Sequence, residues 1–217
     1  KSQLIIQQKM KNNADNKIQF GPNFPPLSFY DEENWEIMER HLVEFYPNKW
    51  FDVILISTET PDFMTYFADC DDGNPISLDL EWESELCLFQ FCFKNKVVIL
   101  RHPNGEGNPK LLNFLLTHKF YAKGIHNDKK QLQKKFNTNC IAKNIEDIAK
   151  TRLIPYNYSE NFMAMVRQFS GEPTAEFKDI KITTSNWELP ELSKRQILYA
   201  AFDVVSLKEC YPNYPPP

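Results

Sequence analysis

The stretch PISLDLEW, residues 75–82, decides the fold. Its apolar and polar residues alternate with a period of two, which is typical of a β-strand with one face in the core. The apolar face carries Ile76, Leu78, Leu80 and Trp82. Asp79 and Glu81 lie two apart and therefore point to the opposite face. Two carboxylates on one face can share a divalent cation with a third ligand, although an ordinary strand with a solvated polar face has the same pattern.

The sequence around this strand predicts an α/β fold with a mixed sheet. Short apolar runs predict further strands, at residues 51–58, 86–93, 97–100 and 119–125. Helical spacing and helix-start signals predict helices, at residues 31–45, 60–69, 109–118, 144–153, near 160–170, at 191–211, and from near Asn127 onward. Consecutive strands followed by alternating helices and strands indicate an antiparallel part at 76–100 and a parallel part further on.

Composition and cysteine usage exclude several classes of protein. The chain has 217 residues, of which 42% are hydrophobic and 25% charged, as in one ordinary globular domain. It contains no run of 18 apolar residues, so we expect no membrane partner, and its start does not have the pattern of a signal peptide. The five cysteines are odd in number and form no CxxC pair, which argues against a disulfide framework or a zinc finger. We therefore expect an intracellular protein, nuclear or cytoplasmic.

The charge of the chain is unevenly distributed. The net charge is −4, which does not by itself indicate nucleic-acid binding. Residues 118–152 nevertheless carry 9 Lys and Arg against 3 Asp and Glu, a net charge of +6, whereas residues 1–82 have a net charge of −9. A local basic stretch can attract phosphate groups even on an acidic protein. A solvated helix face explains the same pattern.

A second pair of polar side chains lies on the long helix predicted at 191–211. Tyr199 and Asp203 are four residues apart, so they lie on one face of that helix. Between them, Ala200 and Ala201 would let the helix approach the sheet closely, which a carboxylate needs in order to meet Asp79. A half-buried tyrosine and a surface aspartate have the same spacing, so this pair alone is not specific.

Asp128 begins the third polar segment, KGIHNDKKQL. It follows Gly124 at the start of a predicted helix, where aspartate is frequently a cap. It is also placed to be a metal ligand carried on a helix end. Lys129 and the lysines after it would place positive charge near any substrate phosphate bound there.

Together these segments resemble one family. ISLDLEW, GIHNDKKQL and SNWELPELSKRQILYAAFD resemble, in this order, the three exonuclease motifs of the DEDD superfamily. The spacing of Tyr199 and Asp203 has the form of the tyrosine (DEDDy) subgroup, which is similar to ribonuclease D, the Werner-type exonuclease and the proofreading domain of bacterial DNA polymerase I. Trp82 and the SNW segment are Werner-like. The resemblance covers about residues 50–212, and although each motif alone is weak, all three in order make a strong signal.

The resemblance implies a ribonuclease H-like (DnaQ-like exonuclease) fold, with a mixed five-stranded sheet flanked by helices, and 3′→5′ exonuclease activity. It also implies roles for four carboxylates and one phenol. Asp79 and Asp203 would hold the ion that activates water, and Asp79 would bridge to a second ion. Glu81 would bind the first ion, Asp128 would help to hold the second directly or through water, and Tyr199 would orient the attacking water.

The chemistry of phosphodiester cleavage supports this ligand set independently. Negative charge develops on the phosphorus, the attacking oxygen and the leaving oxygen, and two cations about 3.5–4 Å apart stabilise both oxygens. Mg²⁺ and Mn²⁺ prefer oxygen ligands, so carboxylates suit them. We therefore expect two divalent ions, Mg²⁺ or Mn²⁺, as cofactors, and nucleic acid with a free single-stranded 3′ end, RNA or DNA, as the substrate.

Several neighbours of these motifs are weaker candidates for substrate contact, namely Leu80, Trp82, His126, Asn127 and Lys129. Core packing is the commoner role for the first two, and turn formation for the next two. Gln90, on the second predicted strand, is a still weaker candidate to face the site. Asp147 has a place in the family pattern and is explained equally well as a helix cap.

The sequence divides into three parts. Residues 1–50 form a predicted N-terminal extension with one helix, residues 51–212 the exonuclease domain, and residues 213–217 a proline-rich tail or the start of a linker. The acidic and aromatic extension could bind a protein partner, although packing onto the domain explains it equally well.

Two alternatives to an active exonuclease stay open at this point. The chain could be a catalytically weak or inactive nuclease-like scaffold within an RNA-processing or repair complex, although the complete set of four carboxylates and the tyrosine argues against it. It could also be an unrelated α/β domain whose motifs coincide by chance. RNA and DNA are distinguished by contact with a 2′-hydroxyl, and the motifs do not show whether such a contact exists.

Overall fold

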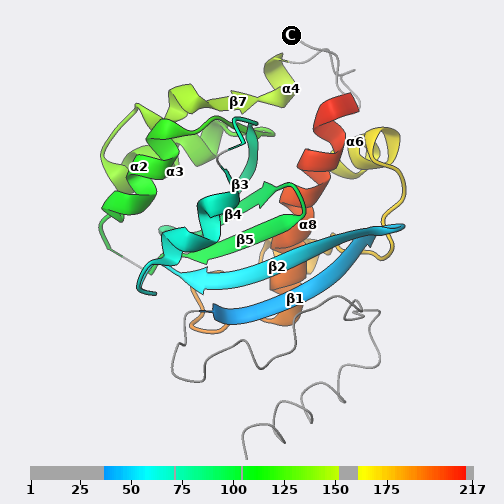
Figure 1. Ribbon diagram of the computed structural model, residues 1–217, viewed down its shortest axis with the longest axis horizontal. Coiled ribbons are helices and arrows are strands. Elements are labelled where there is room, and N and C mark those ends of the chain that lie inside the picture. Colours follow the sequence, from blue (N-terminus) through cyan, green and yellow to red (C-terminus); the bar gives the residue numbers. More distant parts are fainter. Residues whose placement is uncertain (1–36, 71, 104, 152–160, 214–217) are drawn as a thin grey trace, which may run out of the picture.

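A seven-stranded mixed sheet organises the computed structural model, which describes residues 37–70, 72–103, 105–151 and 161–213 (Figure 1). The strand order is β1-β2-β5-β4-β3-β6-β7. The strands are β1 (Ile37–Tyr46), β2 (Lys49–Ser57), β3 (Ile76–Trp82), β4 (Leu86–Phe93), β5 (Lys96–Arg101), β6 (Phe120–Ala122) and β7 (Ile145–Asp147). Strands β3, β4 and β5 are antiparallel neighbours, as predicted, while the pairs β2–β5, β3–β6 and β6–β7 are parallel.

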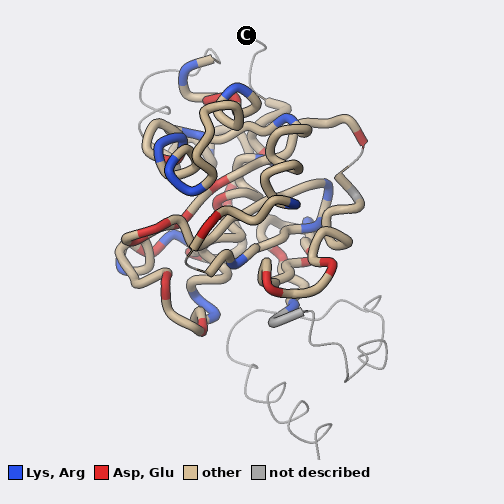
Figure 2. Tube along the Cα trace, turned by 90° about the vertical axis from the view of Figure 1, so that its left-hand side faces the viewer, with Lys and Arg blue, Asp and Glu red and all other residues tan. Residues whose placement is uncertain are grey.

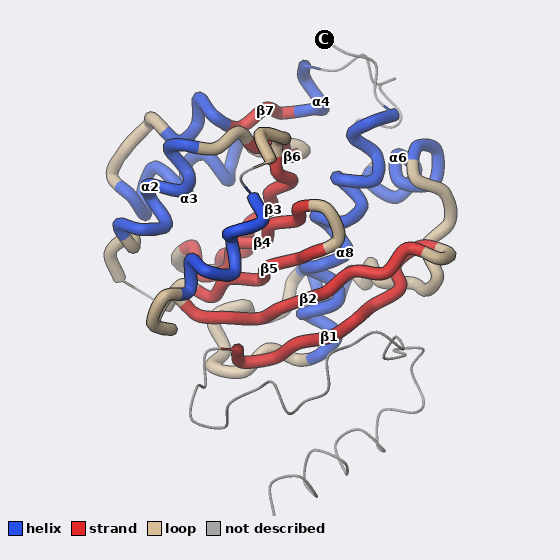
Figure 3. Tube along the Cα trace, viewed as in Figure 1, coloured by secondary structure: helices blue, strands red, loops and turns tan. Residues whose placement is uncertain are grey.

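Helices cover both faces of this sheet (Figure 3). One face packs against α8 (Lys194–Cys210) and α6 (Phe162–Phe169), and the other against α2 (Pro109–Thr117), α3 (His126–Phe136) and the short helix η2 (Phe63–Cys70). The remaining helices are short: η3 (Ile141–Asn144), α4 (Ile148–Thr151), α7 (Ile180–Thr183) and η4 (Tyr211–Asn213). The described residues contain no helix with the length and apolar character that crossing a membrane requires.

The face of β3 that carries the acids is the face that α8 covers. Leu78 and Leu80 are buried in the core beneath α2 and α3, whereas Ser77 contacts α8. The alternation read from the sequence is therefore confirmed. It places the carboxylates of Asp79 and Glu81 under the helix that carries Asp203.

The prediction of a helix at 31–45 is wrong for its described part. Residues 37–46 form the strand β1, which pairs antiparallel with β2 through a two-residue loop at Pro47 and Asn48. Asn48 adopts a left-handed φ of 63°, a conformation that asparagine tolerates better than most residues. Val43 and Phe45 are buried and lie two residues apart, which is the period of a β-strand. The sequence resembled a helix because apolar residues lie on both faces of this strand. The sheet therefore begins before residue 51, and residues 1–36 of the predicted extension lie outside the described residues.

The prediction of five strands is also wrong, and the helix predicted at 144–153 is confirmed only for residues 148–151, since residues 152 and 153 lie outside the described residues. Residues 145–147 form β7, a three-residue edge strand parallel to β6, and helix α4 begins only at Ile148. Strands β1 and β7 account for the two additional strands. A strand of three residues is too short to show a period in the sequence.

Candidate metal centre

Three carboxylates from two elements converge where α8 covers β3. Asp79 and Glu81 come from β3 and Asp203 comes from α8, and one ligand oxygen of each lies within 4.8 Å of the other two. Ala200 and Ala201 of α8 are fully buried, and their small side chains suit a helix that packs closely on the sheet. The geometry thus brings together three of the four predicted metal ligands.

Burial and mutual repulsion dominate the electrostatics of this cluster. Burial raises the pKa of Asp79 well above its ordinary value, and the charges of Asp203 and Asp128 raise it further. Burial, together with Asp79 and Asp203, raises the pKa of Glu81 to about 9. The pKa of Asp203 is also raised by burial, although Lys178 opposes that shift. Buried carboxylates close to one another bind a proton or a cation, because the ionised form without a counter-charge is unfavourable.

A lysine that the sequence motifs do not point to lies directly against this cluster. The Nζ atom of Lys178 donates a hydrogen bond to Oδ2 of Asp203 at 2.7 Å and lies 2.7 Å from Oδ1. It also donates to the hydroxyl of Tyr199 at 2.6 Å and sits 3.9 Å from the centre of that ring. No spacing rule points to this residue, because the turns and short helix between Lys178 and α8 have no regular period.

Tyr199 lies on the same face of α8 as Asp203, as predicted, and its hydroxyl has two described partners. Besides Lys178, the hydroxyl of Thr183 lies 2.8 Å away. The ring packs against Trp187, whose ring centre is 6.0 Å distant. Burial raises the pKa of Tyr199, and the charge of Asp203 raises it further, so the phenol is neutral and can orient a polar neighbour.

The SNW segment holds the start of α8 in place. Ser193 caps the helix, and Gln196 completes a capping box with it. The side-chain amide of Gln196 also donates to the hydroxyl of Ser185 at 3.1 Å and to the carbonyl of Asn186 at 3.0 Å. The third motif therefore fixes the helix that carries Tyr199 and Asp203.

Asp128 lies in the first turn of α3, beside Asp79 but outside the group of three. Both line a hollow of about 10 Å³, and burial raises the pKa of Asp128 to about 6. The residue before the helix, Ile125, makes no side-chain cap, and Asp128 is not placed as one. The turn that precedes α3 is tied to β7, because Asp147 accepts a hydrogen bond from the amide of Gly124 at 3.0 Å. Asp147 is thus a structural residue of the turn.

The weaker candidates fall into three environments. Leu80 is buried, with 3% of its surface exposed, and Trp82 packs partly buried against the same core. His126 and Asn127 are exposed on the first turn of α3, and Lys129 beside them is half-buried. None of these five belongs to the group of three carboxylates, and their contact with substrate stays a prediction.

Gln90 faces the site more directly than its sequence suggested. It pairs with Asp79 across β3 and β4, and it is fully buried. Its amide lowers the pKa of Glu81, although neither polar atom of the amide reaches good hydrogen-bonding geometry with a described residue. The amide is therefore a buried dipole next to the acids.

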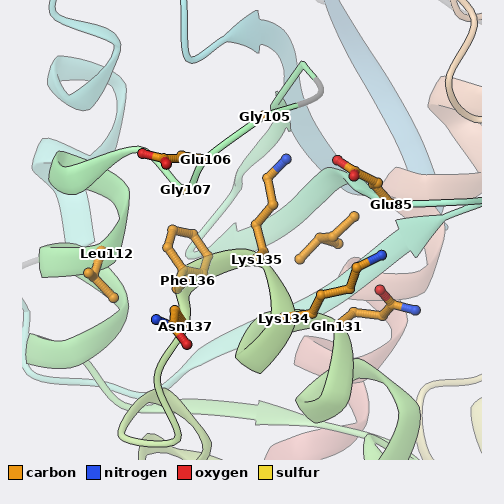
Figure 4. A pocket seen from close by; sticks show the side chains of 11 residues that line it. Glu85, Gly105, Glu106, Gly107, Leu112, Gln131, Lys134, Lys135, Phe136 and Asn137 are labelled. Carbon is orange, nitrogen blue, oxygen red and sulfur yellow. The ribbon is translucent and has the colours of Figure 1, made fainter.

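A larger pocket lies at the other end of α3. Its volume is about 510 Å³, and its rim carries Lys134, Lys135 and Glu85 (Figure 4). Lys134 donates to the carbonyl of Ser84 and Lys135 to that of Pro103, each at 3.4 Å. Along the trace in Figure 2, Lys and Arg are divided among several segments, with Asp and Glu in others, and α3 itself carries four lysines and one aspartate.

Comparison with known proteins agrees with this geometry. Residues 54–213 match the family described as 3′-5′ exonuclease. The chain belongs to this 3′-5′ exonuclease family. It is accordingly a nuclease of the hydrolase class with nucleic acid as its substrate, and the family resemblance read from its motifs is confirmed. No curated protein matches the chain.

Solved structures show that this exonuclease domain shares its fold with other nucleases. Escherichia coli RNase D matches with a TM-score of 0.58 and 20% identity over 72% of this chain and 43% of that one. The EXO domain of Aedes aegypti Nibbler matches with a TM-score of 0.56 and 18% identity over 79% and 89%. Brucella melitensis NrnC matches with a TM-score of 0.53 and 18% identity over 67% and 74%. The expected ribonuclease H-like exonuclease fold is confirmed, with seven strands in place of five.

Proposed function

We propose that this exonuclease domain removes nucleotides one at a time from the 3′ end of single-stranded RNA or DNA, by hydrolysis that depends on two divalent ions. One observation carries the proposal: Asp79, Glu81 and Asp203 converge within 4.8 Å on one side of the sheet. Chains that only keep the fold need no such convergence of buried acids, since burying unpaired carboxylates is costly.

The residues fit divalent ions. The donor set is oxygen only, which suits Mg²⁺ and Mn²⁺. Oδ1 of Asp203 is buried and has no hydrogen bond of good geometry from the described residues; its near neighbour is the ammonium of Lys178 at 2.7 Å, so this oxygen already faces a positive charge. Burial raises the pKa values of Asp79 and Glu81, and repulsion from the neighbouring aspartates raises them further, which a bound cation would relieve. When bound, the ions would lower the pKa of water and stabilise the charge of the leaving oxygen.

Each residue of the site has a distinct role in this proposal. Asp79 and Asp203 would hold one ion, with Glu81 as a further ligand. Asp128, beside Asp79, would help to hold the other. The hydroxyl of Tyr199 orients the attacking water, for which its neutral phenol and its place one turn before Asp203 are suited.

The substrate follows from the same arrangement. A cluster this enclosed between β3 and α8 admits a strand end more readily than a duplex, so we propose an unpaired 3′ end. Lys129, Lys134 and Lys135 along α3 would contact the phosphates behind that end. A protein partner bound through the N-terminal residues stays a prediction outside the described residues.

The direct test uses 5′-labelled single-stranded RNA and DNA oligonucleotides, incubated with Mn²⁺, with Mg²⁺ or with EDTA. We expect a ladder that shortens from the 3′ end only when a metal is present. Asp79→Asn removes one ligand charge at constant size and should abolish the ladder. Asp62→Asn is the matched control, because Asp62 is an exposed aspartate away from the cluster, and it should leave the ladder unchanged.

Two outcomes would contradict the proposal. A ladder that survives both EDTA and Asp79→Asn would mean that the carboxylates are not the catalytic centre. Absence of cleavage of both substrates with either metal would favour the nuclease-like scaffold instead.

A further inference from the structure

The ammonium group of Lys178 occupies a place that a divalent ion at Asp203 would also need. It lies 2.7 Å from both carboxylate oxygens of Asp203, so both oxygens of this carboxylate face the same cation. It lies 2.6 Å from the hydroxyl of Tyr199, the group proposed to hold the attacking water. The site thus contains a positive charge supplied by the chain itself.

The backbone on both sides of Lys178 is anchored. The ring of Phe177 stacks on Phe202 of α8 with 5.1 Å between centres and lies 4.9 Å from Phe45 of β1. On the other side, Asp179 caps α7 by accepting from the amide of Lys181 at 2.9 Å. The packing of Phe177 and the cap formed by Asp179 therefore fix the backbone position from which Lys178 reaches the site.

The strand β1 takes part in this anchoring. The amide of Thr174 donates a hydrogen bond to the carbonyl of Phe45 at 2.9 Å. The hydroxyl of the same threonine donates to the carbonyl of Glu44. The segment that leads to Lys178 is thereby attached to the edge of the sheet.

The charge of Lys178 compensates the acids only in part. The lysine lowers the pKa of Asp79, of Glu81 and of Asp203. Burial nevertheless keeps the pKa values of all three raised, and the charges of neighbouring aspartates add to the shift at Asp79 and Glu81. The cluster can accept more positive charge than the lysine provides. A metal ion at Asp203 would nevertheless be repelled by the ammonium of Lys178.

We propose that Lys178 is a built-in competitor for divalent metal at Asp203, so that one of the two ions of the proposed mechanism binds only when this side chain withdraws. The inference rests on the proposed function in that the carboxylates hold metal. Withdrawal is sterically open, because 24% of the lysine side chain is exposed and its four-carbon stem is flexible. Lys178 thereby sets the metal concentration at which the domain is fully loaded.

The test measures Mn²⁺ binding directly, in the absence of nucleic acid. Free Mn²⁺ is titrated by electron paramagnetic resonance against the wild-type chain, Lys178→Met, Lys178→Arg and Lys181→Met. Lys178→Met keeps the length of the side chain and removes its charge, so the weaker Mn²⁺ site should tighten by about tenfold or more, since unit charges this close interact strongly even at an effective dielectric constant near 20. Lys178→Arg retains the charge and should bind as the wild type does. Lys181→Met, on the exposed side of α7, should change nothing.

A second measurement guards against a folding defect. Melting temperatures are recorded in EDTA and in saturating Mn²⁺. Without metal, Lys178→Met should melt below Lys181→Met, because the acids lose their internal cation, and Mn²⁺ should close that gap. An equal melting temperature of these two variants in EDTA would contradict the inference.

The outcomes separate this inference from the proposed function. A tighter weak site in Lys178→Met supports the inference, as does a second ion that binds only to that variant. Two ions bound equally well by the wild type and Lys178→Met would overturn the inference and leave the proposed function intact. Absence of Mn²⁺ binding to every variant would overturn both.

Discussion

The hydroxyl of Ser77 donates a hydrogen bond to the carbonyl of Val204 at 2.8 Å. This bond joins β3, which carries Asp79 and Glu81, to α8, which carries Asp203. Ser77 is fully buried, two residues before Asp79 on the same face of β3. A small polar residue at this position lets α8 lie close to the strand. The separation of the carboxylates therefore depends on a contact that contains no acid.

We expect Ser77→Ala to lower the free energy of unfolding by about 1 to 2 kcal/mol, because a buried carbonyl loses a donor. Urea denaturation in EDTA measures this. Ser84→Ala is the matched control, because the hydroxyl of Ser84 also donates a hydrogen bond, to Glu188 at 2.7 Å, but at an exposed position, where its loss should cost less. Equal denaturation midpoints for the two variants would show that the strand–helix contact does not need this bond.

The stability of the metal-free protein should fall as the pH rises from about 5 to 9. Burial and the neighbouring aspartates raise the pKa of Glu81 from 4.5 to about 9, so the folded state holds a proton that the unfolded state has released across this range. Linkage then makes unfolding easier at higher pH. We expect melting temperatures in EDTA to decrease with pH, and Glu81→Gln, which cannot ionise, to flatten the slope. A slope that is identical in Glu81→Gln and the wild type would contradict the raised pKa of Glu81.

Tyr199→Phe should lower kcat by about 100-fold, because the attacking water loses the hydroxyl that orients it. Removal of the hydroxyl leaves the carboxylates in place, so Mn²⁺ affinity should change little. Thr183→Ala is the informative companion, because it keeps the phenol and removes one of its two partners. We expect a smaller loss of kcat for that variant, measured on the same oligonucleotide. A wild-type kcat for Tyr199→Phe would remove the tyrosine from the mechanism.

Lysines at the C-terminal end of α3 should contribute to substrate affinity by neutralising phosphates. We expect Lys134→Ala/Lys135→Ala to weaken binding of single-stranded oligonucleotides in Ca²⁺ and to reduce the slope of log affinity against log salt by about 0.7 for each phosphate that the variant no longer neutralises. Fluorescence anisotropy over a range of salt measures both. Lys110→Ala/Lys119→Ala removes the same charge from exposed positions at α2 and just after it, and should keep the wild-type slope. An unchanged slope for Lys134→Ala/Lys135→Ala would exclude α3 from the binding path.

The parts of the site predicted correctly from the sequence are those that follow a local period. Asp79 and Glu81 share a face because a strand repeats every two residues, and Tyr199 and Asp203 share one because a helix repeats every 3.6. The helix predicted in place of strand β1 is wrong because apolar residues lie on both faces of that strand, and only the Pro47–Asn48 turn signals a hairpin. Lys178 could not be predicted, since its position depends on how Phe177 packs between β1 and α8.

The attachment of Thr174 to β1 has a consequence for how such a domain can diverge. Strand β1 ends at Tyr46, before residue 54, where the match to the exonuclease family begins. It contributes no ligand, yet it fixes the segment that brings the ammonium of Lys178 to Asp203. Substitutions in this edge strand would alter how tightly the lysine is held, and with it the metal requirement of the domain. The chain can thus adjust its dependence on metal supply from a place where no catalytic residue has to change.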